Sequence, residues 1–178
     1  MRKVLLAPGE ASDENEVKKW KFHTASLDVH YVGKIFPGSA IYFYHIDSCL
    51  AVVFKLSGGS VVGGHAGVFY YYKGEMVQEG KPSLMKVVDE MLEQCAGQTI
   101  SKVFVVGNTS DWGCNVESEM KKKFAGKTIQ VEDYSHSINV VVDNGMGSVK
   151  VKVYEWVSGE ENDKWMYSIK TPEDNYTL

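Results

Sequence analysis

The segment SAIYFYHIDSCLAVVFKLSGGSVVGGHAGVFYYY, residues 39–72, decides the fold class. Its runs at 39–46, 50–56 and 61–72 are rich in β-branched and aromatic residues, which favours strands. The SGGS sequence between the second and third runs is typical of a hairpin turn. The segment therefore predicts antiparallel strands. Glycines inside the third run indicate a bulge or the close approach of another chain.

The rest of the chain adds two helices and further strands. Apolar residues recur at helical spacing from Leu84 to Cys95, with Ser83 as the expected N-cap and Gly97 as the expected end. A second helix is predicted from Asn115 to about residue 125, because acidic residues come first and lysines last. Further strands are predicted at 27–36, 101–107, 128–134, 138–144 and 148–157, with an edge strand near 165–169. This order predicts an α+β fold, a mixed and mainly antiparallel β-sandwich flanked by two helices.

Length and composition narrow the class of protein. The 178 residues are expected to form a single domain, 1–178. The net charge of −4 offers no footprint for nucleic acid or an anionic membrane surface, and no apolar run is long enough to insert into a membrane. The apolar stretch at the N-terminus is too short for a signal peptide and is expected to form a strand. We therefore expect a cytoplasmic protein, with export by a signal-less route left open. Three cysteines at wide spacing argue against a disulfide framework; Cys95 is expected to be buried and Cys114 to be a free thiol in a loop.

One cysteine and one histidine stand at the edges of the predicted strands. Cys49 directly precedes the 50–56 run, and His65 follows it by sixteen residues inside the 61–72 run. If these runs pair across the SGGS turn, residue 49 lies opposite residues 64–68 and the two side chains share one end of a sheet. A thiolate held by an adjacent imidazolium is a nucleophile, whereas a buried thiol and a core histidine are structural. The residues alone leave both interpretations open.

The order of these motifs resembles the CheD family of chemoreceptor glutamine deamidases. That family carries a Ser-Cys motif, a hairpin and a Gly-His element, matched here by Ser48-Cys49 and Gly63-Gly64-His65. The likeness continues through VHYVGKIFPGSA, LMKVVDEMLEQCAG, KVFVVGN, the helix that begins at Asn115, and IQVEDYSHSINVVVDNGMGSVKVK, and it covers about residues 27–153. The Cys-His layout is also similar to the catalytic domains of the cytotoxic necrotizing factor toxins, which deamidate glutamine as well.

The resemblance implies a protein glutamine deamidase, an amidohydrolase that needs no metal and no organic cofactor. Cys49 would attack the carboxamide of an exposed glutamine on a protein substrate, and His65 would support the thiolate and protonate the departing ammonia. Ser48 and the Cys49 backbone would stabilise the oxyanion, and Gly64 would let the substrate approach. The family's threonine six residues before the cysteine is Phe43 here. The orienting role would then fall to the Phe43 backbone or to His45, unless His45 faces solvent.

Two other functions fit the same fold. A non-catalytic protein-binding module would have kept the sheet and lost the orienting group within residues 43–47, and another cysteine hydrolase would act as a peptidase or acyltransferase. A deamidase would be either a housekeeping enzyme acting on a receptor, as in chemotaxis, or an effector toxin acting on a host protein. Residues 1–26 and 154–178 are expected to extend the core, and His136 is a candidate for the rim of the substrate cleft.

Overall fold

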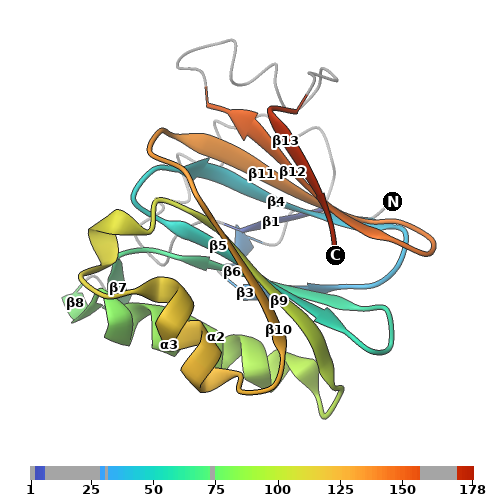
Figure 1. Cartoon of the computed structure of the whole chain (residues 1–178), viewed down its shortest axis with the longest axis horizontal. Helices are drawn as coiled ribbons and strands as arrows, with labels where there is room; N and C mark the ends of the chain where they lie inside the picture. Colours follow the sequence, from blue (N-terminus) through green and yellow to red (C-terminus); the bar gives the residue numbers. More distant parts are fainter. Residues whose placement is uncertain (1–2, 7–28, 31, 73–74, 157–171) are drawn as a thin grey trace.

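The computed structural model describes residues 3–6, 29–30, 32–72, 75–156 and 172–178. They form three layers, in which a six-stranded sheet packs on a five-stranded sheet and two helices cover the other face of the five-stranded sheet (Figure 1). A two-stranded sheet lies beside the helical layer. The predicted α+β class is confirmed.

Six strands make the sheet that lies farther from the helices. Its order is β13-β12-β11-β4-β1-β2, with β1 at Lys3–Leu6, β2 at Val29–His30, β4 at Ser39–Ile46, β11 at Ile138–Asn144, β12 at Val149–Glu155 and β13 at Asp174–Thr177. β1 pairs in parallel with β4 and β2, whereas β11 pairs antiparallel with β4 and β12, and β13 antiparallel with β12. Residues 3–6 and 174–177, which the sequence had placed in extensions, therefore supply two strands of this sheet.

The five-stranded sheet is built around the central hairpin. Its order is β10-β9-β5-β6-β3, with β3 at Val32–Ile35, β5 at Leu50–Leu56, β6 at Val61–Ala66, β9 at Ile100–Gly107 and β10 at Thr128–Asp133. β5 pairs antiparallel with β6 and β9, and the predicted hairpin turn is closed by the Leu56 N–H, which donates to the Ser60 carbonyl at 2.9 Å. The chain crosses from β4 in one sheet to β5 in the other through residues 47–49, so Cys49 stands at a crossover between the two sheets.

Two helices pack on the five-stranded sheet. α2 spans Lys81–Cys95 and confirms the predicted apolar stripe, whose most buried members are Leu84, Val87, Val88, Met91 and Cys95. Ser83 does not cap this helix as predicted, because the helix begins at Lys81 and the Ser83 hydroxyl donates to the Gly67 carbonyl at 2.7 Å. α3 spans Val116–Lys123, and its predicted start is confirmed by Asn115, whose Oδ1 accepts a hydrogen bond from the Ser118 N–H.

The apolar core has two parts, one on each face of the five-stranded sheet. Along β5, Leu50, Val52 and Phe54 face the helices, whereas Ala51 and Val53 face the six-stranded sheet. Because β5 is covered on both faces, nearly every residue in it is buried. This explains why the sequence of β5 is an almost continuous apolar run instead of an alternating one.

The predicted strand at 61–72 is two strands. β6 ends at Ala66, and β7 (Phe69–Tyr72) pairs with β8 (Glu75–Glu79), a strand that the sequence did not predict. The break occurs where the chain turns to meet α2, because the Val68 carbonyl accepts a hydrogen bond from the Gly80 N–H at 2.7 Å. The edge strand predicted near residues 165–169 lies outside the described residues.

Candidate active site

The β5–β6 hairpin brings Cys49 and His65 to one face of the five-stranded sheet. In its register Ala51 pairs with His65 and Leu50 pairs with Ala66. Cys49 stands one residue before β5, and because side chains alternate along a strand it shares the face of Ala51 and His65. The two residues are therefore diagonal neighbours on adjacent strands, a spacing that long side chains can bridge. This face lies against the six-stranded sheet, where Cys49 packs on the cluster between the sheets.

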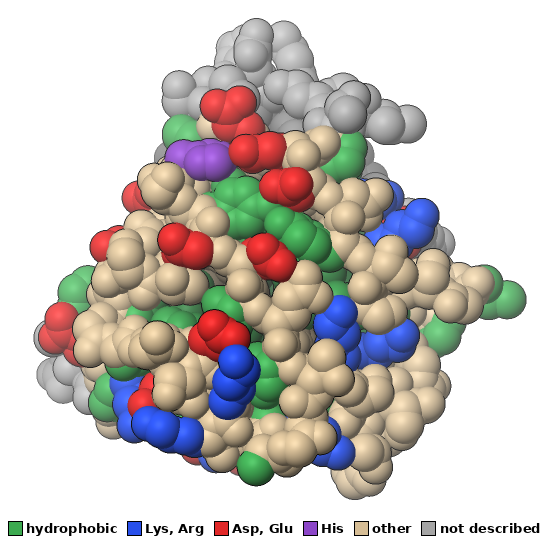
Figure 2. Space-filling view, in the orientation of Figure 1, with side chains coloured by type: hydrophobic (Ala, Val, Ile, Leu, Met, Phe, Trp, Pro, Cys, Tyr) green, Lys and Arg blue, Asp and Glu red, His purple; other side chains and the backbone are tan. Residues whose placement is uncertain are grey.

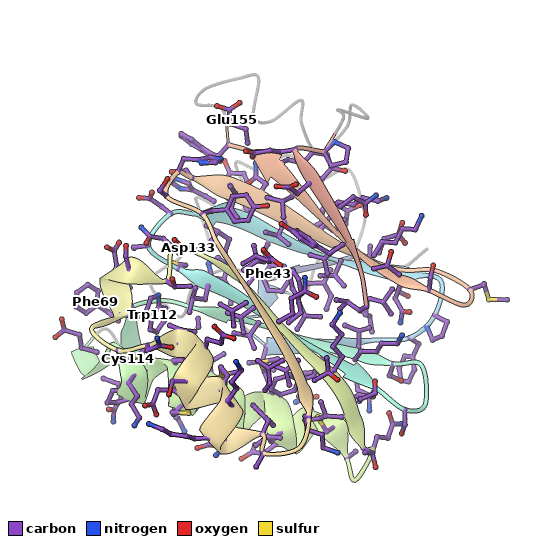
Figure 3. All side chains as sticks on the ribbon, in the orientation of Figure 1. Phe43, Phe69, Trp112, Cys114, Asp133 and Glu155 are labelled. Carbon is purple, nitrogen blue, oxygen red and sulfur yellow. The ribbon has the colours of Figure 1, made fainter. Side chains whose placement is uncertain are left out.

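His65 is a core residue at the end of β6. Its side chain is 1% exposed, and its ring centroid lies 6.2 Å from that of Phe43. Figure 3 shows Phe43 between the two sheets. Phe43 takes the position at which the resemblance expects a threonine. A phenyl ring has no oxygen to accept a hydrogen bond from an imidazole, so the Phe43 side chain contributes packing to His65 and no threonine-like acceptor.

The Cys49 thiol is protonated at neutral pH in this structure. Burial, with a smaller contribution from the nearby Asp47 carboxylate, raises the pKa of Cys49 to about 12. The resemblance predicts the opposite, a thiolate whose pKa is lowered by an imidazolium. Here the pKa of Cys49 is shifted the other way, because the thiol packs against apolar side chains and the Asp47 charge that acts on it is negative. These surroundings favour a neutral thiol.

A β-bulge shapes the chain just before Cys49. Phe43 pairs with Val140 and Ile46 pairs with Ile138, so two residues of β4, Tyr44 and His45, stand opposite the single residue Asn139. His45 has a positive φ of 53°, and its N–H donates to Asn139 Oδ1 at 2.9 Å. The bulge bends the end of β4 toward the crossover that carries Cys49.

Asp47 and Ser48 occupy the turn between the bulge and Cys49. Asp47 accepts a hydrogen bond from the Ser137 hydroxyl at 2.8 Å, which ties the turn to the chain just before β11. Ser48 is half-buried and directly precedes Cys49. This placement keeps Ser48 next to the thiol, where a donor to an oxyanion is needed.

The structure decides between the alternatives left open for His45 and gives Gly64 a role other than the one expected. The His45 ring is exposed and stacks on Trp156 at 4.3 Å between centroids, so it faces solvent and the end of β12 instead of orienting His65. A Cβ on Gly64 would overlap Met91 and would lie 2.8 Å from Val87 Cγ1. The space that Gly64 leaves open is therefore filled by α2, on the sheet face opposite Cys49, and not by a substrate.

Two residues that contact the chain on either side of the crossover were missed by the sequence prediction. Asn139 is fully buried in β11, and Gly107 ends β9 beside the Cys49 backbone. Each of the two residues is unusual in its sequence context. Asn139 is a polar residue between apolar ones in a predicted strand, and Gly107 follows directly on a buried apolar run. Neither feature predicts a position near the crossover, because both residues lie in strands far from Cys49 in the sequence.

A pocket of about 300 Å³ lies at the same end of the five-stranded sheet, on its helix side. It is lined by Thr109, Cys114, Asn115, Val116, Glu117, Val131 and Asp133. Asp133 Oδ1 accepts hydrogen bonds from both the N–H and the hydroxyl of Thr109. Cys114 is a half-buried free thiol, and burial is the main cause that raises its pKa. Asp133 and Cys114 are labelled in Figure 3.

The surface over this end of the molecule is acidic. Figure 2 shows acidic side chains over the part formed by the six-stranded sheet and the end of β10, and basic side chains both over the helices and at the right-hand side of the view. The exposed acidic residues there include Asp133, Glu173 and Asp174. His136, the candidate for the cleft rim, is exposed and its Nε2 lies 3.1 Å from Glu173 Oε2.

Metal and membrane sites have no support within the part of the chain that the structure describes. There, no group of three His, Cys, Asp or Glu side chains could hold a metal ion. Neither α2 nor α3 has the length and apolar character needed to cross a bilayer, and no other described helix does. All three cysteines are free thiols, and Cys95 is buried as predicted.

Comparisons with known proteins find a similarity in structure and none in sequence. No family model matches the chain, and no curated protein matches it. Among solved structures, the chain is similar to the C-terminal domain of CNFy from Yersinia pseudotuberculosis, with 7% identity and a TM-score of 0.37. The match covers 79% of this chain and 53% of that one, so the chain spans about half the length of that structure. A TM-score this low is compatible with the α+β architecture and decides nothing about activity.

Proposed function

We propose that the chain is a cysteine-dependent amidohydrolase that converts a glutamine side chain of a protein substrate to glutamate. The observation that carries the proposal is the register of the β5–β6 hairpin, which puts Cys49 and His65 on one sheet face as diagonal neighbours. Cys49 directly precedes β5 and His65 lies in β6, so the ladder between these two strands begins at the residue next to the nucleophile. The resemblance of the Ser48-Cys49 and Gly64-His65 motifs to glutamine deamidases names the reaction.

The raised pKa of Cys49 decides how the reaction would start. Because the resting thiol is neutral, His65 must accept its proton when the carboxamide binds, as a general base. The sulfur then bonds to the carboxamide carbon, and the oxyanion that forms is stabilised by the Cys49 N–H and by Ser48. His65 returns the proton to the departing ammonia, which leaves a thioester. Water that gives a proton to His65 attacks the thioester carbon, and the thiol leaves with that proton to yield glutamate.

A non-catalytic binding module is the second candidate, and two observations favour it. Phe43 stands where the resemblance expects a hydrogen-bond acceptor that orients His65. The pKa of the Cys49 thiol is raised, whereas a resting nucleophile would need a lowered one. In that case Cys49 and His65 are core residues that remain from a catalytic ancestor or that serve packing. The two candidates differ in one measurable property, the turnover of a glutamine amide.

The test is deamidation of a complex protein mixture. The purified protein is incubated with a dialysed cell extract, ammonia release is measured, and peptides are searched for glutamine converted to glutamate. We expect site-specific conversion by the wild type, none by Cys49→Ser, and strongly reduced conversion by His65→Gln, which keeps most of the buried volume. Cys114→Ser is the matched control, because Cys114 is also a half-buried free thiol. We expect this variant to retain activity.

Three results would contradict the proposal. Equal conversion by wild type and Cys49→Ser would assign the activity to something else, and no conversion by either would favour the binding module. New peptide termini in place of converted glutamines, again dependent on Cys49, would identify a peptidase.

A further inference from the structure

We propose that Gly107, at the end of β9, is a positioning residue that fixes the backbone of Cys49 for the reaction proposed above. Gly107 pairs with Leu50, the first residue of β5, and so lies directly beside the crossover between the sheets. The inference rests on the proposed function for its catalytic consequence. The geometry of the Cys49 backbone, on which it is built, does not depend on that function.

Only glycine fits at position 107. Its φ is +143°, a conformation that residues with a side chain rarely adopt. A Cβ built there would overlap the Cys49 carbonyl oxygen, and it would lie 2.9 Å from Ile46 Cγ2 and 3.2 Å from the Leu50 Cα. The crossover therefore packs against the bare backbone of Gly107 from both sides of Cys49.

The end of β9 has little freedom to move away from an added methyl group. The Gly107 carbonyl accepts a hydrogen bond from the Tyr134 N–H at 3.0 Å, just after β10. Two residues farther on, both the N–H and the hydroxyl of Thr109 bind Asp133 Oδ1, at 2.8 and 2.7 Å. Because β9 is tied to β10 here, a clash at Gly107 is relieved by displacement of the crossover, and Cys49 moves with it.

The crossover is also held from the six-stranded sheet. Asn139 is fully buried, and its Oδ1 accepts the N–H of His45, which stabilises the bulge that leads into the crossover. Asn139 acts on the preceding residues and Gly107 acts on Cys49 itself. The nucleophile is thus placed by one residue from each sheet, which explains how a residue outside regular structure can hold a defined position opposite β6.

The test compares Gly107→Ala with Gly80→Ala. Gly80 is a matched control because it also has a positive φ, of 59°, and its Cβ would also meet a backbone carbonyl, that of Trp112 at 2.8 Å. Three quantities are measured: the midpoint of thermal unfolding, kcat and KM for a glutamine peptide found in the extract experiment, and the pH profile of Cys49 alkylation, with Cys114 as the internal reference.

We expect Gly107→Ala to lower kcat about 100-fold with little change in KM, because a displacement of about 1 Å at a reacting group costs roughly that factor. Its Cys49 alkylation rate, relative to that of Cys114 in Gly107→Ala and in the wild type, should change by about 10-fold or more, since burial controls the thiol. Gly80→Ala should lose comparable stability and keep both kcat and the Cys49 profile.

Other outcomes separate this inference from the proposed function. If the wild type converts no glutamine, the proposed function fails and the alkylation profiles alone decide the positioning role. Equal effects of both substitutions, or a wild-type Cys49 profile in Gly107→Ala, would overturn the inference. If Gly107→Ala does not fold, it is combined with Ile46→Ala, which removes the Cγ2 that the new methyl group would meet at 2.9 Å and leaves its overlap with the Cys49 carbonyl. A Cys49 profile in the folded double variant equal to that of Ile46→Ala alone would then overturn the inference.

Discussion

The titration of Cys49 distinguishes a buried thiol from a preformed catalytic pair, and pH is the perturbation. A free cysteine has a pKa of about 8.5, so a few per cent of it is thiolate at pH 7. With a pKa of about 12, Cys49 has far less. The thiolate fraction at pH 7 is then lower by a factor on the order of 1,000, because each pKa unit is tenfold. We expect the alkylation rate of Cys49 to rise about tenfold per pH unit up to at least pH 10, with no plateau.

The assay is alkylation by iodoacetamide with quantification at the peptide level. Each of the three cysteines lies in a different segment, so a digest reports them separately. Free cysteine in the same solution supplies the reference curve, and a short pulse at each pH limits reaction of unfolded molecules. Far-UV circular dichroism across the pH range confirms that the protein stays folded.

A plateau below about pH 8 would refute the reasoning. It would show that positive charge stabilises the thiolate in the resting protein, because such charge is what lowers the pKa of a thiol below its free value. Loss of that plateau in His65→Gln would identify His65 as the partner. The general-base start proposed above would then be replaced by attack of a preformed thiolate.

The same pKa has a consequence for stability. The folded state raises the pKa of Cys49 above its unfolded value, so its contribution is fully present below about pH 8.5 and is lost as the pH rises toward 12. Within that window the free energy of unfolding should fall by about 1.4 kcal/mol per pH unit relative to Cys49→Ser, which lacks the thiol. Urea unfolding of both proteins at several pH values measures the difference. Parallel curves would contradict the raised pKa.

Two further predictions concern packing. Gly64→Ala should destabilise the fold by about 1–3 kcal/mol, because the new methyl group overlaps Met91 of α2 and overpacks the core; urea unfolding measures it, and a neutral result would mean that α2 is not seated on β6 as described. Tyr134→Phe should cost about 1 kcal/mol, because the Tyr134 hydroxyl donates to Asp174 and lies 2.9 Å from the Tyr176 hydroxyl, which ties β13 to the rest of the fold. Hydrogen exchange of the β13 amides should quicken in that variant, and unchanged exchange would show that the strand is held by other contacts.

Local pattern was enough to predict several parts of the fold. The helical stripe of α2, the start of α3 at Asn115 and the hairpin that joins β5 to β6 all follow from residues close together in the chain. Such features depend on periodicity, on turn glycines and on capping side chains, which act within a few residues. The sequence also predicted that residue 49 lies opposite residues 64–68, whereas the register that gives Cys49 and His65 the same face comes from the structure.

The failures of prediction come from contacts between distant segments. Serine is a favoured N-cap residue, but the Ser83 hydroxyl donates a hydrogen bond to the Gly67 carbonyl, and the helix begins before Ser83. Gly64 suggests room for a substrate, but the helix α2 fills that room. In both cases the residue has the chemical property that the prediction relied on. A partner from a distant part of the chain decides which interaction the residue makes.

The sequence by itself determined the α+β class and the pairing of the strand that follows Cys49 with the strand that carries His65. Both depend on local periodicity and on turn residues. Only the tertiary structure decided the state of the candidate nucleophile. The pKa of Cys49 depends on burial between two sheets and on Asp47, and its position depends on Gly107 and Asn139 from strands β9 and β11. Burial and electrostatic fields are sums over neighbours in space, and the order of residues along the chain does not state which neighbours those are.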